Sequence, residues 1–403
     1  MINIGLLGLG TVGSGVLEIL DSRREELKNI TGHDINIRKI LVKDLNKKRP
    51  IKIKPGILTD NFNDILEDKD ISIIVEATGD LEKGYDYIRK SLKEGKNVVT
   101  ANKAVVSRHF EELTELAEKE GLAFLYEASV GGGIPLLKSL KEQLALNEIT
   151  EVKGILNGTC NYILTEMERG LDYFEALRIA QRKGFAELDP TDDVEGLDTR
   201  RKLRILGTLA LGSTILEEDI VLRGIRSIKA IDIEYINKMN CSIKLIGEIK
   251  SYEEGYTAIV EPMIVNKNSP FYSVYYEKNA VLLKGDKVGD LIFYGNGAGK
   301  LPTANAILTD VIDIIMGLSK TESPVGTNKL ENINISLKGK YYLRISKVSK
   351  NIYSIMESIA KEILCEKENI VIMTKSMLLN DILKLLKVLE IKEEEYFLAR
   401  KEC

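Results

Sequence analysis

The sequence predicts an α/β protein whose first part is a doubly wound parallel sheet. Apolar runs that suit buried strands alternate with helical patterns from Ile2 to about residue 135, as in right-handed βαβ units. A glycine-rich turn follows the first apolar run directly. Strand-like runs then gather in residues 243–294, which indicates a second, α+β domain with helices on one face of its sheet. A chain of 403 residues is long enough for two or three domains.

Composition excludes several classes of protein and of site. With 44% hydrophobic and 29% charged residues and a net charge of -4, the chain has no basic surface that predicts nucleic acid or an anionic membrane as a partner. No apolar run is long enough to span a membrane, and Met1 enters a strand without a charged leader or cleavage site, so we expect a cytoplasmic protein. The four cysteines are far apart and argue against a zinc site or disulfides. Because His33 and His109 are the only histidines, any proton carrier should be Lys, Asp, Glu or Tyr.

The glycine turn has the pattern G-x-G-x-x-G between a strand, Ile2–Leu7, and a helical run. In this setting Gly8 permits the tight turn, Gly10 lets a pyrophosphate approach the backbone, and Gly13 lets the helix pack close to the strand. The helix N-terminus supplies free N–H groups and a positive dipole end. The motif therefore predicts a Rossmann-type, dinucleotide-binding domain.

The end of the second strand bears on the choice of cofactor. Residues 35–42 form this strand, and Lys43 and Asp44 follow it, with three more cations at residues 47–49. An acidic residue here normally binds the ribose 2′-hydroxyl of NAD, whereas a cation accommodates the 2′-phosphate of NADP. The order favours NADP and leaves NAD possible. A solvated basic loop is the alternative.

Further strands end in polar residues. Residues 71–79 and 97–100 form two of them, and Asn102 and Lys103 follow the second. A last strand, residues 123–127, ends at Glu127 and precedes three consecutive glycines. Those glycines free backbone carbonyls that, with Glu127, would suit a hard monovalent cation. A flexible turn is the simpler interpretation.

The stretch from Gly184 to Lys202 is the strongest candidate for chemistry. It contains six carboxylates within a dozen residues and is interrupted by Pro190 and Gly196, so we expect a loop. Helical apolar spacing begins near Asp198, which places Asp198 and Lys202 four residues apart on one helix face. Such a pair facing a cleft can hold a polar substrate and move a proton. The alternative is a solvated loop followed by a surface ion pair.

The remaining segments complete the domain plan. A strand at residues 148–156 leads into an Asn-Gly turn and helix cap, whose Asn or Tyr side chains could reach a small substrate. A glycine loop at residues 295–302 then opens a helix at residues 305–318. We expect domains at residues 1–135, rejoined by 300–320, and at 136–299, then a linker at 321–331 and a small α+β tail at 332–403. The tail's predicted order is strand 341–346, helix 352–363, strand 370–374, helix 377–389 and strand 396–399. Binding or subunit contact is its expected role.

Five motifs together resemble homoserine dehydrogenase over residues 1 to about 320. They are Gly8-x-Gly10-Thr-Val-Gly13, Thr100-Ala-Asn-Lys103, Asn157-Gly-Thr-x-Asn-Tyr-Ile-Leu164, the stretch from Gly184 to Lys202, and Gly297-Ala-Gly299. The tail resembles an ACT regulatory domain. The resemblance implies NAD(P)-dependent interconversion of L-homoserine and L-aspartate 4-semialdehyde, in threonine, methionine and isoleucine biosynthesis.

The resemblance also implies roles for individual residues. Lys202 would exchange the proton with the substrate oxygen, and Lys103 would be a second lysine where cofactor and substrate meet. Glu187, Asp193 and Asp198 would bind homoserine. The cofactor would contact Gly8, Gly10, Thr11, Val12, Gly13, Lys43, Thr78, Lys103, Gly184 and Gly297. A sodium ion would be held by Glu127 and by the carbonyls of Val130, Gly132 and Ile134.

The chemistry is consistent with a lysine in this role. Hydride leaves carbon as a proton leaves oxygen, so a base must lie within hydrogen-bond reach of the hydroxyl. A lysine, ordinarily near pKa 10.4, must have its pKa lowered by burial or by a neighbouring cation to act near neutrality. In the reducing direction the ammonium stabilises charge growing on the aldehyde oxygen.

The sequence departs from the family pattern at two places. The turn of residues 347–351 lacks the glycine usual in amino-acid-binding ACT domains, so we expect weak or absent threonine feedback and a tail that mainly aids assembly as a homodimer or homotetramer. Lys43 stands where arginine often binds the 2′-phosphate.

An aldehyde-oxidising semialdehyde dehydrogenase would need a cysteine nucleophile with a histidine partner. An NAD(P)-binding regulatory protein would bind nucleotide without turnover.

Overall fold

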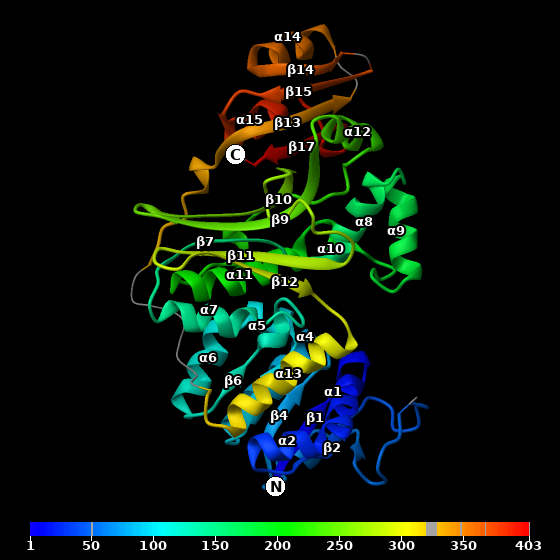
Figure 1. The fold of residues 1–403 in the computed structure, drawn as a ribbon, viewed down its shortest axis with the longest axis vertical. Coiled ribbons are helices and arrows are strands. Elements are labelled where there is room, and N and C mark those ends of the chain that lie inside the picture. The colour runs from blue at the N-terminus through cyan, green and yellow to red at the C-terminus, as the bar shows by residue number, and fades with distance from the viewer. Residues whose placement is uncertain (50, 320–328, 347–348, 367, 403) are drawn as a thin grey trace. The chain divides into compact units, whose positions relative to one another are not determined.

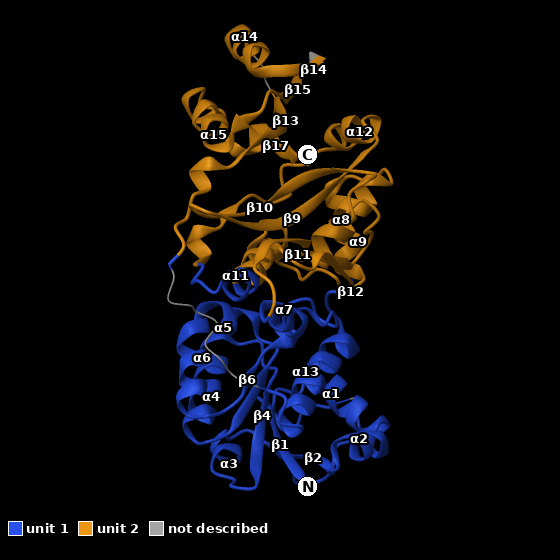
Figure 2. Ribbon diagram, turned by 60° about the vertical axis from the view of Figure 1, so that its left-hand side comes forward, with its two compact units in different colours: residues 1–145, 205–215, 295–329 blue, residues 146–204, 216–294, 330–403 orange. Residues whose placement is uncertain are grey.

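The computed structural model describes residues 1–403 apart from 50, 320–328, 347–348, 367 and 403. The chain divides into two compact units, coloured separately in Figure 2. Unit 1 comprises residues 1–145, 205–215 and 295–329. Unit 2 comprises residues 146–204, 216–294 and 330–403. Most of the predicted linker, residues 321–331, lies outside the described residues.

Unit 1 contains a six-stranded parallel sheet, which confirms the predicted α/β class. The strands are β1 (Ile2–Leu7), β2 (Ile35–Leu41), β3 (Leu58–Thr59), β4 (Ile71–Glu76), β5 (Asn97–Thr100) and β6 (Phe124–Leu125). Their order is β3-β2-β1-β4-β5-β6, so the direction of winding changes between β1 and β4 (Figure 1). In open parallel sheets, ligands bind beyond the carboxyl ends of the strands at such a switch point.

Helices surround this sheet because their apolar faces must be buried against it. They are α1 (Thr11–Ser22), α2 (Arg24–Thr31), α3 (Asn63–Leu66), α4 (Leu81–Lys93), α5 (Lys103–Arg108), α6 (Phe110–Lys119), α7 (Leu136–Leu144) and α13 (Lys300–Ile315). Gly15 brings α1 close to α13, since a Cβ there would lie 2.7 Å from the carbonyl oxygen of Lys300. Helix α13 begins before its predicted start because Pro302 fits in a first helical turn.

Unit 2 contains a mixed sheet of long strands. Its main path is β12-β11-β7-β9-β10-β17-β13-β15-β14. The first part consists of β7 (Ile149–Ile155), β9 (Cys241–Tyr252), β10 (Gly255–Asn266), β11 (Lys278–Gly285) and β12 (Gly289–Asn296), with β8 (Val221–Leu222) beside β10. β9 and β10 form an antiparallel hairpin that is buried over most of its length. Strand β12, whose residues alternate between half-buried and exposed, was not predicted from the sequence.

The helices of this part are α8 (Gly158–Glu168), α9 (Tyr173–Arg182), α10 (Thr191–Val194), the start of α11 (Leu197–Leu211) and α12 (Ala230–Lys238). From Ile205 onward, α11 belongs to unit 1. Helices α8 and α12 pack against β9. The start of α11 also approaches β9 closely, since a Cβ at Gly247 would lie 3.2 Å from the Thr199 methyl group and 3.3 Å from Leu203. Glycine at this point of the strand therefore lets α11 lie against the sheet.

The tail continues the same sheet. It consists of β13 (Lys338–Ser346), α14 (Lys350–Ile359), β14 (Ala360–Glu366), β15 (Asn369–Thr374), β16 (Met377–Leu378), α15 (Leu379–Val388) and β17 (Tyr396–Lys401). Without the short β16, the order is βαββαβ, the ferredoxin-like arrangement. Strand β17 pairs in parallel with β10 through Met263 and Arg400, and Ile259 of β10 lies in the tail's apolar core.

One tail helix ends earlier than predicted. The predicted helix over residues 352–363 stops at Ile359, and β14 follows at once, antiparallel to β15. The apolar residues Ile352, Ile355, Ile359 and Ile363 have helical spacing, which is why the sequence predicted one helix. Pairing with β15 overrides that local preference.

Candidate active site

The glycine turn between β1 and α1 is shaped by close backbone contacts. Gly8 has a φ of +98°, and a Cβ there would lie 2.6 Å from the carbonyl oxygen of Ala77. A Cβ at Gly13 would lie 2.2 Å from the carbonyl oxygen of Gly8. Both positions therefore require glycine. A Cβ at Gly10 would meet nothing within 4 Å, so the turn is open beside the first amides of α1, which favour an anion.

A buried carboxylate organises the ends of β4 and β5. Glu76 accepts a hydrogen bond from the Thr78 hydroxyl at 2.5 Å and one from the Thr100 hydroxyl at 2.6 Å. Asn102 then caps α5 through its side-chain oxygen, and Lys103 is the first residue of that helix. Glu76 thus fixes the two strand ends from which Thr78 and Lys103 project.

The corner after β2 is a basic loop folded on itself. The Arg49 guanidinium donates to the carbonyl oxygens of Asp44, at 2.6 Å, and Lys47, at 2.8 Å. Lys43 is exposed, and its ammonium lies 3.8 Å from Asp80. Cations therefore gather at the position where a 2′-phosphate is normally recognised.

In unit 2, four side chains form what we call the lysine–aspartate cluster: Asn157, Asp193, Asp198 and Lys202. The buried Lys202 ammonium donates to Asp198 and to the carbonyl oxygen of Leu156, both at 2.7 Å. The Asn157 amide donates to Asp193 at 2.6 Å and to Asp198 at 2.9 Å. The predicted pairing of Asp198 with Lys202 on one helix face is confirmed, and it is buried rather than solvated.

Local backbone features bring these residues together. Asn157 is the N-cap of α8, because its side-chain oxygen accepts the Cys160 amide at 2.8 Å. Gly158 lies so close to the carbonyl oxygen of Glu277 that a Cβ would approach it to 2.6 Å. Gly196, with a φ of +84°, turns the acidic loop into α11. Each glycine thus allows a backbone path that a larger residue would disturb.

Charge within the cluster is unbalanced, with two carboxylates to one ammonium. Burial raises the pKa of Asp193 above its usual value, and repulsion by Asp198 adds to the effect, although Asn157 and Lys202 oppose it. Burial also raises the pKa of the Cys160 thiol well above its ordinary value. Because a nucleophilic cysteine needs a lowered pKa, Cys160 does not support the semialdehyde-dehydrogenase alternative.

Other predicted site residues lie apart from this cluster. Glu187 is exposed, and its backbone oxygen accepts a hydrogen bond from Gln181 at 3.0 Å. Gly184, also exposed, has a φ of +76°. In unit 1, Gly297 lies against Gly132, where a Cβ would lie 2.5 Å from the Gly297 carbonyl.

Glu127, the predicted metal ligand, has a structural role. Its carboxylate accepts the amides of Leu136 at 2.6 Å, Leu137 at 2.9 Å and Lys138 at 2.7 Å, and so caps α7. Burial raises the pKa of Glu127, although these amides oppose the shift. In the described part of the chain, no group of three or more His, Cys, Asp or Glu side chains is arranged to hold a metal ion.

Comparison with known proteins decides the family. A model of the NAD-binding domain of homoserine dehydrogenase matches residues 8–127, and a homoserine dehydrogenase model matches residues 135–312. The homoserine dehydrogenase of Synechocystis is 40% identical over 352 residues, which cover 86% of this chain and 80% of that protein. The chain belongs to the homoserine dehydrogenase family. It is therefore an NAD(P)-dependent oxidoreductase of amino-acid biosynthesis that acts on homoserine.

Other homoserine dehydrogenases give the same result. That of Bacillus subtilis is 40% identical over 318 residues, covering 79% of this chain and 73% of that protein. The crystal structure of a homoserine dehydrogenase from Thiobacillus denitrificans covers all of this chain and 98% of that one, with 32% identity and a TM-score of 0.90. Among the described residues, no helix combines the length and apolar character needed to cross a membrane.

Two organising residues, Glu76 in unit 1 and Asn157 in unit 2, were not predicted in those roles. The sequence places Glu76 only within a strand, and it predicts a turn and cap at Asn157 whose Asn or Tyr side chains could reach a small substrate. A polar residue inside an apolar strand was the available signal for Glu76. Asn157 lies 36 residues from Asp193 and 41 from Asp198, so its bridging role follows only from the fold.

Proposed function

We propose that Lys202 carries the proton as homoserine and aspartate 4-semialdehyde are interconverted. The observation that supports this role is the buried Lys202 ammonium, which donates to Asp198 and the Leu156 carbonyl. Two of its three protons are thus used among the described residues, and the third is left for a substrate oxygen. In the oxidising direction the uncharged amine accepts the hydroxyl proton, and in the reducing direction the ammonium returns it.

The carboxylates of the site bind the substrate in this proposal. Homoserine carries an α-ammonium group, and Asp193, Asp198 and Glu187 supply negative charge for it. Asn157 spaces Asp193 and Asp198 by donating one hydrogen bond to each, which prevents the two carboxylates from turning away from each other. Lys103, at the start of α5, is proposed as the second lysine that polarises the reacting oxygen.

The nucleotide site fits an NAD(P) cofactor, which supplies hydride transfer when bound. The open side of Gly10 and the first turn of α1, Thr11 and Val12, suit the pyrophosphate. We propose that NADP is preferred, because Lys43 and Arg49 place cations after β2. A hyperthermophilic archaeal homoserine dehydrogenase with the same fold, at 23% identity, was solved in complex with NADPH. Thr78, Gly184 and Gly297 are further proposed contacts.

A sodium ion is proposed at Glu127 and the carbonyls of Val130, Gly132 and Ile134. Two buried carboxylates support it, since Asp310 accepts the Glu127 amide at 2.9 Å. Burial, and next the charge of Glu127, raises the pKa of Asp310 well above its ordinary value. A bound cation would relieve this repulsion. Glu127 also accepts three amides, so only its remaining lone pairs would serve the ion.

The remaining proposals concern the tail, assembly and location. The βαββαβ order of the tail suits an ACT-like domain, and we propose that it aids assembly of a homodimer or homotetramer. A cytoplasmic location is supported by Cys160, Cys241 and Cys365, which are free thiols.

A spectrophotometric assay of homoserine with NADP or NAD tests these proposals. We expect absorbance from reduced nicotinamide to appear only when homoserine is present, with a lower KM for NADP than for NAD. Lys43→Ala should raise the KM for NADP and leave that for NAD almost unchanged. Nucleotide binding without turnover would favour the regulatory alternative, and equal KM values would remove the NADP preference.

A further inference from the structure

A cavity of about 320 Å³ lies within unit 2 where the tail joins the long hairpin. It is lined by side chains from β7, β9, β10, β13, β17 and the loop of residues 268–270. Its volume is near the lower end of about 300–1,000 Å³ for ligand pockets. None of its lining residues belongs to the lysine–aspartate cluster.

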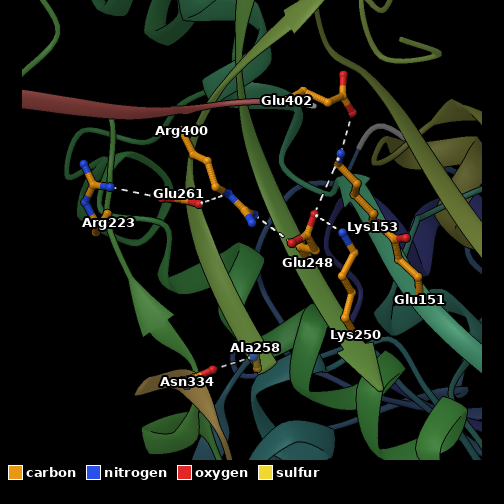
Figure 3. Close-up of polar contacts among 10 residues, drawn as sticks. All are labelled: Glu151, Lys153, Arg223, Glu248, Lys250, Ala258, Glu261, Asn334, Arg400 and Glu402. Carbon is orange, nitrogen blue, oxygen red and sulfur yellow. Dashed lines mark hydrogen bonds and ion pairs between the residues drawn. The ribbon is translucent and has the colours of Figure 1, made fainter. Parts of the chain in front are cut away.

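Beside the cavity, charged side chains from four strands, from a loop and from the residue just beyond β17 form what we call the junction cluster: Lys153, Arg223, Glu248, Glu261, Arg400 and Glu402. Arg400 donates to Glu248 at 2.7 Å and lies 2.6 Å from Glu261 (Figure 3). Arg223 lies 3.0 Å from Glu261, and Lys153 pairs with both Glu402 and Glu248. The cluster therefore joins the last strand of the tail to the sheet of the preceding domain.

The surroundings of Glu248 stabilise negative charge. Glu248 is almost fully buried, and burial alone would raise the pKa of its carboxyl. The attraction of Arg400, Lys250 and Lys153 outweighs that effect, so the pKa of Glu248 lies below its ordinary value. A carboxylate that ionises more easily in the interior than in water marks a place that stabilises negative charge.

Two more lysines add charge that the cluster does not neutralise. Lys338 is exposed and Lys401 is half-buried, and both line the cavity. Neither forms an ion pair with another described residue. The lining thus has five cations, completed by Lys153, Lys250 and Arg400, against the two carboxylates Glu248 and Glu402.

Glu402 supplies an internal anion at this place. One of its oxygens pairs with Lys153, and the other is buried without a hydrogen-bond partner among the described residues. Glu402 is the last described residue of the chain, just beyond β17. A carboxylate held at one atom only is a weak competitor for an anion that would be held at several.

We propose that this cavity is a binding site for a small anion that carries a carboxylate or phosphate group. Lys338 and Lys401 receive the anion at the cavity, and Lys153 holds it in place of Glu402. Asn266, Asn268 and Ser269 provide neutral hydrogen-bonding groups beside the charges. A bound anion bridges the tail and the preceding sheet, so its occupancy also stabilises their junction.

Isothermal titration of the full chain with sodium phosphate and, separately, sodium succinate tests the proposal, with sodium chloride at equal ionic strength as the baseline. We expect saturable binding of at least one anion, and the tighter of the two assigns phosphate or carboxylate chemistry. The variant Lys338→Met/Lys401→Met should bind about tenfold more weakly, because two charge contacts are lost. Glu402→Gln should bind more tightly, because a competing charge is removed.

The matched control is Lys384→Met/Lys387→Met, which removes the same charge from two exposed lysines on α15, away from the cavity. We expect its affinity to equal that of the unmodified chain. The proposal is overturned if neither anion binds saturably, if the control weakens binding as much as the cavity variant, or if Glu402→Gln binds more weakly. Lys338 and Lys401 lie outside the buried ion pairs, so their replacement leaves the fold intact.

Discussion

The lysine–aspartate cluster and the junction cluster both pair buried cations with carboxylates, but their charge balance differs. In the first, Lys202 faces Asp193 and Asp198, whose charges are kept together by the neutral donor Asn157. In the second, three cations face three carboxylates, and Glu248 and Glu261 each contact at least two of those cations (Figure 3). The excess of carboxylate in the first cluster is consistent with the proposal that it binds a substrate cation, whereas the balanced second cluster is suited to holding strands together.

The largest effect on stability is expected at the junction cluster. Among the described residues, Arg400→Met leaves the fully buried Glu261 with Arg223 as its remaining cation, and it should lower the free energy of unfolding by about 3–5 kcal/mol. Urea denaturation measures this loss. Homoserine turnover per folded molecule should stay nearly constant.

The control for Arg400→Met is Lys238→Met, which breaks the exposed pair with Glu234. It should change the free energy of unfolding by less than about 1 kcal/mol. Equal losses in the two variants would show that the junction cluster does not stabilise the fold.

A smaller gain in stability is expected at Lys244, a buried lysine of β9 that belongs to neither cluster. Burial lowers the pKa of Lys244 to about 8. The folded state therefore binds fewer protons than the unfolded state between about pH 8 and 10.5, and stability rises with pH across that window. Below pH 8 the cost of burying the charge is present in full.

Lys244→Met should accordingly raise the free energy of unfolding at pH 7 by about 2 kcal/mol, and the gain should shrink toward pH 10. The Val274 carbonyl that Lys244 binds at 2.8 Å keeps a hydrogen bond from Asn161. Urea denaturation at several pH values measures the difference. If Lys244→Met instead lowered the free energy of unfolding at pH 7, the buried charge of Lys244 would not be destabilising.

Asn157→Ser sharpens the account of the lysine–aspartate cluster. Serine keeps the N-cap of α8 but cannot donate to both Asp193 and Asp198. We expect kcat/KM to fall about tenfold. Because Asn157 lowers the pKa of Asp193, its loss should move the acidic limb of the pH profile to higher pH. An unchanged pH profile would show that Asn157 does not position Asp193 and Asp198 for the reaction.

The smallest effect is expected from threonine. An allosteric effector typically changes affinity by about 5–150-fold. We expect millimolar threonine to change turnover by less than about twofold, because the turn at residues 347–351 lacks glycine. Strong inhibition in a titration would restore a feedback role for the tail.

Local patterns predicted those features that depend on neighbours in sequence. The glycine turn and the Asp198–Lys202 pair have fixed local spacing, so the sequence predicted both. Asn157 and the β10–β17 pairing depend on residues far apart in the chain, and no periodic pattern records such contacts. Residues 360–363, the first part of β14, were predicted as the end of a helix because their apolar spacing continues a helical pattern, and only pairing with β15 decides for a strand.

The most direct test of the central claim is homoserine turnover by Lys202→Ala with and without added methylamine. We expect a fall in kcat of roughly a hundredfold to ten-thousandfold, nearly unchanged NADP affinity, and partial, saturable recovery with methylamine. Lys153→Ala, which removes the junction lysine, should keep its kcat and gain nothing from the amine. Turnover by Lys202→Ala close to that of the unmodified chain, without any amine, would contradict the account.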